Sequence, residues 1–472
     1  MIGQIARKDI LGNLVSLRFV LSLLLVIALA ATGGFVFVDE YRLQAQDYRN
    51  QANETLAGFR ERAGRLYQLA FYQHRIYQEP KPLTFFAEGF EQSLPNSCTF
   101  NAFTVQLPEA QHQRNFLLPV LSNLDWVFLT GLVLSFVALL LTYDCVCGEK
   151  EAGTLGLMLA GSVPRHKVLA AKYLGAMFTV GIPLLAGVLV SLIVVVASRE
   201  VVFSAGDWLK IPVLVVLSFL YLSIFVLLGI LVSSRTAHSA NSMVMLLLVW
   251  VGLVILIPSF GRVIAEITST GSSPQESRRR LREAYEQVDA DYEAGKFGEN
   301  AGARSPNIAE CNPPARARYI NAGTNAENRA IEDCYRQMLA QASAGRNVAC
   351  LSPTAIYQRA SEAIAGTGIS HGVSLNEQIR RYQTELREYI RAQDREDPQS
   401  LHLLFDEENS TEEWNAISKK PADFAAVPKF QERNLTLAES LRLAVWDIGL
   451  LVLFNVVVFA AAFASFLKYD VR

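Results

Sequence analysis

Six stretches of the 472-residue chain are almost wholly apolar, and polar segments separate them. They run over residues 19–38, 126–143, 168–197, 211–233, 243–261 and 448–467. A helix that crosses a bilayer needs about 20 mostly apolar residues, because the hydrocarbon layer is about 30 Å thick and each residue adds about 1.5 Å. Buried helices of soluble proteins average only about 11–12 residues. The pattern therefore predicts six transmembrane helices, with Lys172 as the one charge inside an apolar run.

Lys and Arg residues in the short flanks predict the orientation, because cytoplasmic flanks carry an excess of them. One side carries Arg7, Lys8, Arg18, Lys150, Arg165, Lys167, Lys172, Arg235, Lys468 and Arg472. The short loop on the other side, residues 200–210, has only Lys210, with Arg199 at its edge. We expect the first side to be cytoplasmic, with both termini inside. An A-x-A pattern at residues 28–30 would suit signal-peptidase cleavage, but the apolar run continues to Val38, which favours an uncleaved span.

The pattern predicts an all-α polytopic membrane protein with six transmembrane helices and a mainly helical extracytoplasmic domain. The expected parts are a cytoplasmic segment (1–18), spans (19–38, 125–143, 168–198, 211–233, 242–265 and 447–467), a cytoplasmic loop (144–167), two extracytoplasmic segments (39–124 and 266–446) and a cytoplasmic tail (468–472). In the outer segments, helices are expected at 39–77, 277–293, 325–342 and 376–395. The last of these has an apolar stripe at helical spacing: Ile379, Tyr382, Leu386 and Ile390.

Composition adds little to this picture, since 51% hydrophobic and 19% charged residues suit either a membrane protein or a large soluble one. The net charge of −2 gives no electrostatic case for nucleic-acid binding, and no nucleic-acid partner is expected. The chain has no G-x-x-x-x-G-K-[ST] or H-E-x-x-H motif, and its six histidines are scattered. We therefore expect no catalytic residue, no metal and no cofactor.

Residues 368–372 match G-x-S-x-G, the pattern of a hydrolase nucleophile elbow. That structure requires a strand before the motif and a helix after it. Residues 355–365 have a helical pattern instead, so a glycine-rich link between helices is the favoured interpretation.

Four of the six cysteines fall in the expected outer segments, where an oxidising compartment permits disulfides. Cys98, Cys311, Cys334 and Cys350 are the disulfide candidates, and three pairings are possible. A bond between Cys311 and Cys334 would leave Cys98 and Cys350 to tie the two outer segments together. The inner Cys145 and Cys147 are expected to be buried or interfacial thiols.

Polar residues at the spans could line a substrate path, because such groups are costly in a membrane and often functional. Asp125 and Asp447 each stand at the expected outer edge of a span beside a Trp, where they could also lie among headgroups or cap a helix. Asn455 is mid-span and suits a hydrogen bond between helices.

The cytoplasmic loop between the second and third spans contains the sequence GEKEAGTLGLMLAGSVPRHKVLAAK. Thr154 could cap a short helix with an apolar stripe at Leu155 and residues 157–159, which Pro164 would end. An exposed amphipathic helix on the inner face requires a partner, either the membrane surface or another protein.

This loop resembles the E-x-E-x-G-T-L…P-x-x-R/H…K segment of ABC-2 type transporter permeases. The residues that match are Glu149, Glu151, Gly153, Thr154, Leu155, Leu157, Pro164 and Arg165. The N-terminal IGQIARKDILGNLVSLRF is similar to the amphipathic elbow helix of these permeases. The large outer segments look most like the bacterial subgroup with a DUF3526-type domain, related to gliding-motility permeases, in which an Asp such as Asp125 precedes the second span.

The resemblance implies a permease subunit of an ABC exporter in the bacterial inner membrane, which would have no ATPase motif of its own. Its partners would be a separate ABC ATPase, a second permease in a homo- or heterodimer, and membrane lipids. The matching loop would act as the coupling helix, with residues 234–240 as a second ATPase contact. An alternative remains: the spans could relay ATPase motion to the outer domain with nothing crossing the bilayer. The few polar residues in the spans suit an apolar or lipid-like substrate, or none: Asn455, Ser191, Ser218, Ser223 and Thr130.

Overall fold

The computed structural model describes residues 2–89, 97–106, 125–154, 164–260, 274–302 and 310–467. Helices dominate these residues. The elements are α1 (Ile2–Leu14), α2 (Leu17–Arg62), α3 (Leu66–Phe71), β1 (His74–Tyr77), η1 (Pro82–Phe85), β2 (Ser97–Phe100), α5 (Trp126–Phe128), η3 (Leu129–Leu134), α6 (Ser135–Leu140), α7 (Cys147–Glu151), α9 (Arg165–Ala197), α10 (Ala205–Arg235), α11 (Ser239–Trp250), η4 (Val251–Leu256), α13 (Pro274–Glu293), α14 (Pro313–Ala349), α15 (Pro353–Ala365), α16 (Ile369–Arg395), α17 (Glu408–Trp414) and α18 (Leu437–Leu467).

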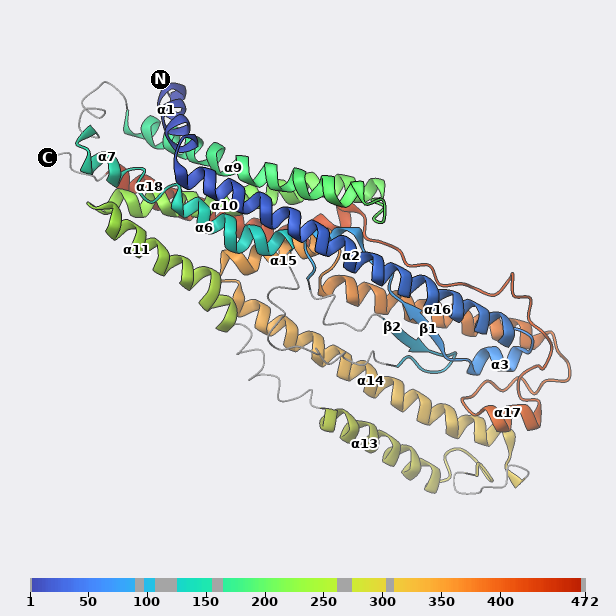
Figure 1. Ribbon diagram of the computed structural model, residues 1–472. Coiled ribbons are helices and arrows are strands. Elements are labelled where there is room, and N and C mark those ends of the chain that lie inside the picture. The colour runs from blue at the N-terminus through green and yellow to red at the C-terminus, as the bar shows by residue number, and fades with distance from the viewer. Residues whose placement is uncertain are drawn as a thin grey trace.

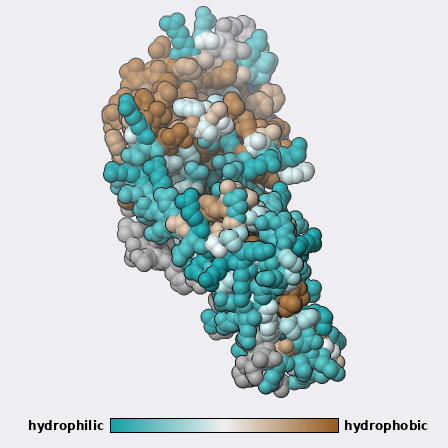
Figure 2. All heavy atoms as spheres, turned by 90° about the vertical axis from the view of Figure 1, so that its right-hand side faces the viewer, coloured by the Kyte–Doolittle hydropathy of each residue, from teal (hydrophilic) through white to brown (hydrophobic). Residues whose placement is uncertain are grey.

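The molecule is long, with an apolar helical bundle at one end and a polar arm at the other (Figure 1). Helices α9, α10, α11 and α18 lie in the bundle, near the two chain termini, whereas α13, α14, α16 and α17 lie in the arm. Figure 2 shows the hydrophobic side chains gathered on a belt over the bundle and hydrophilic side chains over the arm. This division is the one expected of a protein that is partly embedded in a bilayer.

Five of the described helices are long and apolar enough to cross a membrane: α2, α9, α10, the helix Ser239–Phe260 and α18. The sixth predicted span corresponds to a shorter apolar helix, Trp126–Leu140. Within it, η3 is a π-helical turn, and a second π-helical turn, η4, interrupts Ser239–Phe260. The all-α membrane class is confirmed, and the count of six spans stays a prediction.

Helix α2 begins in the bundle, where the Ser16 hydroxyl accepts a hydrogen bond from Phe19 N (3.2 Å), and continues without interruption into the arm. Its 46 residues extend over roughly 70 Å. The predicted helical continuation of the first apolar run is therefore confirmed, but its predicted end at Tyr77 is wrong. The helix ends at Arg62 rather than Tyr77, and the chain then forms α3 and strand β1.

Strands β1 and β2 form an antiparallel pair in which His74 lies opposite Phe100. The pair packs in the core of the arm with Phe59, Leu69 and Tyr382. Four-residue strands carry almost no periodic signal, so packing against this core, rather than local pattern, selects the extended conformation.

The three other helices predicted in the polar segments are confirmed within α13, α14 and α16, and their extracytoplasmic location stays a prediction. In α16 the predicted apolar stripe is buried: Ile379, Tyr382, Leu386 and Ile390 are each at most 8% exposed. This stripe joins α16 to the end of α2 and to the β1–β2 pair, so the two outer segments share one core.

Candidate functional site

Lys172, the charge inside the third apolar run, is buried at the end of the bundle near both termini. Its Nζ lies 3.1 Å from Glu149 Oε2 and 3.6 Å from Asp9 Oδ2, and it donates to Cys145 O (2.7 Å). The Lys172 side chain is 2% exposed and that of Glu149 is 16% exposed. One ammonium group thus joins α9 to the elbow helix α1 and to the loop helix α7. We call Lys172, Glu149 and Asp9 the inner charge cluster.

Helix α1 lies close against α9 at the same level. A Cβ at Gly175 would be in ordinary van der Waals contact with Ala6 O (3.4 Å) and Asp9 Cβ (3.6 Å), which shows how near the two helices lie. Lys8 Nζ is 4.0 Å from Glu149 Oε1 and adds a weak surface contact. The elbow helix therefore contacts both a span and the loop.

Glu151 contacts the loop between α10 and α11. Its Oε1 accepts from Ser239 N (2.9 Å), and its Oε2 accepts from Ser239 Oγ (2.6 Å), at the first residue of α11. These bonds hold the pKa of the Glu151 carboxyl below its usual range. The carboxylate satisfies an N–H at the positive end of the α11 dipole. Glu151 thus joins the start of the coupling loop to the residues predicted as a second ATPase contact.

Two further contacts hold α7 to the end of α10. Lys150 Nζ donates to Ser234 O (2.7 Å) and Thr236 O (3.0 Å), where the last carbonyls of α10 lack helical partners. Ser233 Oγ accepts from the backbone N–H groups of Val146 and Cys147 (3.0 Å each). The loop is therefore fixed to the fourth span by its backbone as well as its side chains.

The remaining residues of the predicted coupling loop have different positions. Gly153 has a positive φ of 68° directly after α7. Thr154 Oγ1 donates to Glu149 O (3.4 Å), so the Thr154 hydroxyl points back to α7. Leu155 and Leu157 lie outside the described residues.

Pro164 and Arg165 start α9. Pro164 takes an extended conformation just before the helix, and its carbonyl oxygen accepts from Lys167 N (2.9 Å). Arg165 Nη1 donates to Leu467 O (2.7 Å), at the end of α18. The third and last spans are thus joined at the same end of the bundle.

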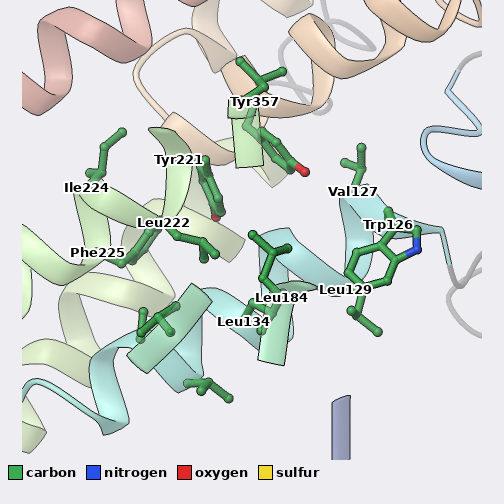
Figure 3. Packing of buried hydrophobic residues seen from close by; sticks show 14 of the residues in the cluster. Trp126, Val127, Leu129, Leu134, Leu184, Tyr221, Leu222, Ile224, Phe225 and Tyr357 are labelled. Atoms are coloured by element: carbon green, nitrogen blue, oxygen red, sulfur yellow. The ribbon is translucent and has the colours of Figure 1, made fainter. Parts of the chain in front are cut away.

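At the opposite end of the bundle, α15 is inserted between apolar helices. Its Tyr357 ring stacks on Tyr221 of α10, with centroids 4.6 Å apart and planes 18° apart (Figure 3). Tyr221 Oη donates to Gly131 O in η3 (2.8 Å) and lies 2.9 Å from Thr354 Oγ1. Tyr357 Oη lies 2.8 Å from Ser218 Oγ. A short outer helix thus takes part in the core of the bundle.

The first residues of α15 also contact the second π-helical turn. Ser352 Oγ caps α15 by accepting from Ala355 N (3.3 Å) and donates to Leu253 O in η4 (2.5 Å). A π-helical turn frees carbonyl oxygens that need partners in an apolar setting. The α15 cap thus satisfies a carbonyl in η4, whereas in η3 the carbonyl of Gly131 accepts from Tyr221 of α10 and from Ser135 Oγ (2.6 Å).

Asp125 acts as a helix cap. Its Oδ1 accepts from Phe128 N (2.7 Å) at the start of α5, and its Oδ2 accepts from Glu88 N (2.9 Å) in the outer segment. This geometry favours the interpretation of Asp125 as a helix cap over that of a residue lining a substrate path.

Asp447 does not begin a helix, because α18 starts ten residues earlier in the chain at Leu437. Its carboxylate forms an ion pair with Arg359 of α15, and the two side chains are 17% and 13% exposed. Arg359 Nη1 also contacts Cys350 Sγ (3.0 Å). Asn455 donates to Leu220 O of α10 (2.9 Å), the predicted bond between helices.

The disulfide candidates lie on separate elements. Cys98 is a free buried thiol that donates to Gln106 O (3.6 Å), and burial raises the pKa of this thiol to about 11. Cys311 precedes α14, Cys334 lies within it and Cys350 follows it. The pairings stay predictions.

The G-x-S-x-G segment does not form a nucleophile elbow, because helix α15, not a strand, precedes it. Gly366 ends α15 in the left-handed conformation (φ 80°), and Ser370 lies in the first turn of α16. The neighbouring His371 is buried, with Nε2 3.2 Å from Glu432 Oε1 and in contact with Lys81 Nζ. The sequence could not predict this contact, because Lys81, His371 and Glu432 lie far apart in the chain.

Taken with the apolar bundle, these contacts define the class: a polytopic helical membrane protein in which the loop after the second apolar run and helix α1 contact the spans at one end of the bundle, and the polar arm contacts them at the other. The chain belongs to the ABC-2 family of transporter proteins, since the family model described as an ABC-2 family transporter protein matches residues 4–471. The predicted resemblance is confirmed, and with it the role of a transmembrane permease component. The narrower subgroup with a DUF3526-type domain stays a prediction. No curated protein matches the sequence.

Proposed function

We propose that this chain is the permease subunit of an ABC exporter in a bacterial inner membrane, driven by a separate ATPase subunit that docks on the loop after the second span. In this topology both termini and residues 144–167 are cytoplasmic, and residues 39–124 and 266–446 are extracytoplasmic. A second permease, in a homo- or heterodimer, completes the transporter, and lipids cover the remaining apolar faces. The basic bias of the short flanks supports this orientation.

The observation that carries the proposal is the inner charge cluster together with Glu151. A force applied to the coupling loop reaches α1 and α9 through Lys172, and reaches α11 through Glu151. Glu149 and Glu151 are engaged within the chain, so their proposed role is to transmit motion rather than to contact the ATPase. The ATPase contact then belongs to Thr154 and the residues that follow, including Leu155 and Leu157.

The outer end of the bundle supplies the second half of the proposed mechanism. Helix α15 contacts both interrupted helices and is joined to α18 through Arg359 and Asp447. Rocking of the spans would change these contacts and open or close the outer end of a path, which is a shift between two packed arrangements. Asp125, Asp447 and Asn455 lie beside this path in the proposal.

Few polar side chains are available to line such a path. Ser191 donates to Ala30 O (2.8 Å), Ser218 contacts Tyr357, and Ser223 contacts Tyr173 Oη (2.7 Å), so these hydroxyls serve packing between helices. We propose an apolar or amphipathic substrate.

The test separates docking from transmission. Leu157→Asp is expected to abolish co-purification of the ATPase from native membranes, because it removes an apolar docking residue. Glu149→Gln with Glu151→Gln is expected to keep the ATPase bound but to uncouple ATP hydrolysis from substrate release in proteoliposomes. Lys167→Gln, on an exposed neighbouring residue, is the control and should match the wild type. Unchanged ATPase recovery with Leu157→Asp would contradict the docking site, and unchanged coupling with the Gln pair would contradict the transmission role.

One observation favours the alternative function, in which nothing is translocated: α2 is a single helix that links the bundle to the arm. A flexible Gly-Ser insertion after Arg49 would interrupt this helix outside the bundle. Mechanical transmission predicts loss of function with ATPase coupling intact, whereas transport predicts little change in substrate release.

A further inference from the structure

The arm contains an open pocket of about 390 Å³ between the start of α14 and the end of α16. In Figure 1 both of these segments lie near α17, at the end of the molecule opposite the two termini. The pocket is therefore remote from the bundle and from the contacts described above.

Its charged lining is unbalanced. Three arginines line the pocket, Arg318 from α14 and Arg391 and Arg395 from α16, against a single carboxylate, Asp394. Three guanidinium groups against one carboxylate leave a net charge of +2 with His402 neutral. Arg391 and Arg395 are one helical turn apart, an arrangement that destabilises a helix when nothing lies between the charges.

The carboxylate of Asp394 is already occupied. Its Oδ1 accepts from Ser400 Oγ (2.6 Å) and Ser418 N (2.7 Å), and its Oδ2 lies 3.1 Å from His402 Nδ1. Asp394 is 6% exposed, so it holds the loop in place and does not neutralise the arginines. Because Asp394 binds Nδ1, the outward nitrogen of His402 is Nε2.

The arginines have unused donors. Within the part of the chain that the structure describes, Arg391 and Arg395 form no ion pair and no side-chain hydrogen bond. Arg318 donates Nε and Nη2 to Phe297 O (3.1 and 2.9 Å), which fixes its guanidinium while Nη1 has no partner among the described residues. Burial lowers the pKa of Arg387, one turn away, and the positive charge of Arg391 lowers it further.

Apart from Asn321 and His402, the rest of the lining is apolar and includes the buried side chains of Ile390 and Ile417 and the half-buried Leu403. The adjacent backbone is held open by Asn321 Nδ2, which donates to Leu404 O (3.0 Å), and by His402, which has a positive φ of 56°. Positive φ is uncommon outside glycine, and histidine is one of the few other residue types that adopt it more often, so His402 suits this position of the loop.

From this juxtaposition we infer that the pocket binds a small organic anion, in which a carboxylate or phosphate lies between Arg318, Arg391 and Arg395 and an apolar group packs on Ile390 and Ile417. Arginine is suited to these anions because its planar donors match two oxygens at once. The site is separate from the proposed transport path, so its failure would leave the proposed function untouched.

The experiment uses the full chain in nanodiscs of zwitterionic lipid, with phenyl phosphate as the probe and binding followed by saturation-transfer NMR. Wild-type protein is expected to bind phenyl phosphate, inorganic phosphate to compete weakly, and benzyl alcohol not to compete. Arg391→Ala with Arg395→Ala is expected to raise the dissociation constant at least about tenfold. The matched control is Arg329→Ala with Arg381→Ala, which removes the same charge from exposed positions of α14 and α16 outside the pocket.

A control variant that binds as well as the wild type, beside a pocket variant that does not, supports the inference, provided that circular dichroism shows both variants folded. Equal loss in both variants would mean that general surface charge attracts the anion, and would overturn it. Absence of wild-type binding would overturn it as well. Competition by a soluble short-chain phosphatidylglycerol, but not by benzoate, would assign the same arginines to a lipid headgroup and reject a free organic anion.

Discussion

Lys172 on the third apolar helix forms an ion pair with Glu149 on the loop after the second, with Nζ and Oε2 3.1 Å apart. Asp9 of the elbow helix lies 3.6 Å from the same ammonium group. One buried cation on α9 thus contacts two other segments of the chain, α1 and the loop that carries Cys145 and Glu149. This explains how a charge can remain inside an apolar helix, because a buried charge is tolerated when it is paired and hydrogen-bonded.

Replacing Lys172 by Met should destabilise the protein by about 3 kcal/mol, because it leaves the Glu149 carboxylate without its buried partner. Thermal unfolding of the purified protein measures the change. Lys167→Met on the exposed surface of α9 should be nearly neutral. The double variant Glu149→Leu with Lys172→Met should recover most of the stability, since apolar residues often replace a buried ion pair without loss. It should not recover ATPase coupling, and recovery of coupling would contradict the proposed transmission role.

The tyrosine pair at the outer end of the bundle predicts an unequal effect of two similar substitutions. Tyr221→Phe removes two contacts of one buried hydroxyl, with Gly131 O and with Thr354 Oγ1, and should lower the free energy of unfolding by about 1–3 kcal/mol, although Ser135 Oγ (2.6 Å) still donates to Gly131 O. Tyr357→Phe should cost less, about 1 kcal/mol, because Ser218 Oγ keeps its bond to Leu214 O (2.9 Å). Hydrogen exchange in α15 and thermal unfolding report both effects. Equal costs would mean that the contact between the Tyr221 hydroxyl and Thr354 does not hold α15.

Asp447 and Arg359 provide a test of whether Asp447 contacts substrate or holds α15. If the ion pair holds α15 to α18, Asp447→Asn and Arg359→Gln should each reduce stability, and the double variant should be no worse than either alone. Binding of substrate at Asp447 predicts instead that Asp447→Asn alone changes which substrate is released. A double-mutant cycle measured by unfolding and by release separates the two, with Arg433→Gln as an exposed control.

The sequence could predict the features that a bilayer imposes locally. Apolar length and absence of charge located α2, α9, α10 and α18, because each spanning helix must satisfy its own backbone. The role of α15 could not be predicted in the same way. Its 13 residues are too few to cross a bilayer, so its apolar face predicts only an ordinary helix of the polar segment.

In the candidate site, the sequence could identify individual residues but not the partners that they contact. Lys172 and Glu149 stood out by residue type and motif, but their contact depends on tertiary packing. The contact between Arg359 and Asp447 also depends on tertiary packing, because Arg359 belongs to no motif and Asp447 lies in another segment. The sequence wrongly predicts a helix as far as Tyr77, because a four-residue strand is too short for an alternation of apolar and polar residues to show.

His74 makes the stability of the arm depend on pH. Its ring lies among Phe59, Tyr72 and Phe100, with centroids 4.5, 4.9 and 5.3 Å away, and its Nε2 is buried with no hydrogen-bond partner among the described residues. Burial lowers the pKa of His74 to about 4. Since the unfolded chain binds this proton near pH 6.5, the folded arm is fully stable above that value. As the pH falls from about 6.5 to about 4, protonation of His74 in the unfolded chain should lower the free energy of unfolding by up to about 3 kcal/mol.

His74→Phe keeps a ring at this position and removes the titrating group, so the variant should lose much less stability over the same pH range. Hydrogen exchange of β1 and α3, corrected for the intrinsic effect of pH on exchange, measures the change locally. His166→Gln, on an exposed residue at the start of α9, is the matched control and should retain the pH dependence of the wild type. An unaltered pH dependence in His74→Phe would show that another group in the arm titrates, because the aromatic packing around residue 74 is nearly preserved in that variant.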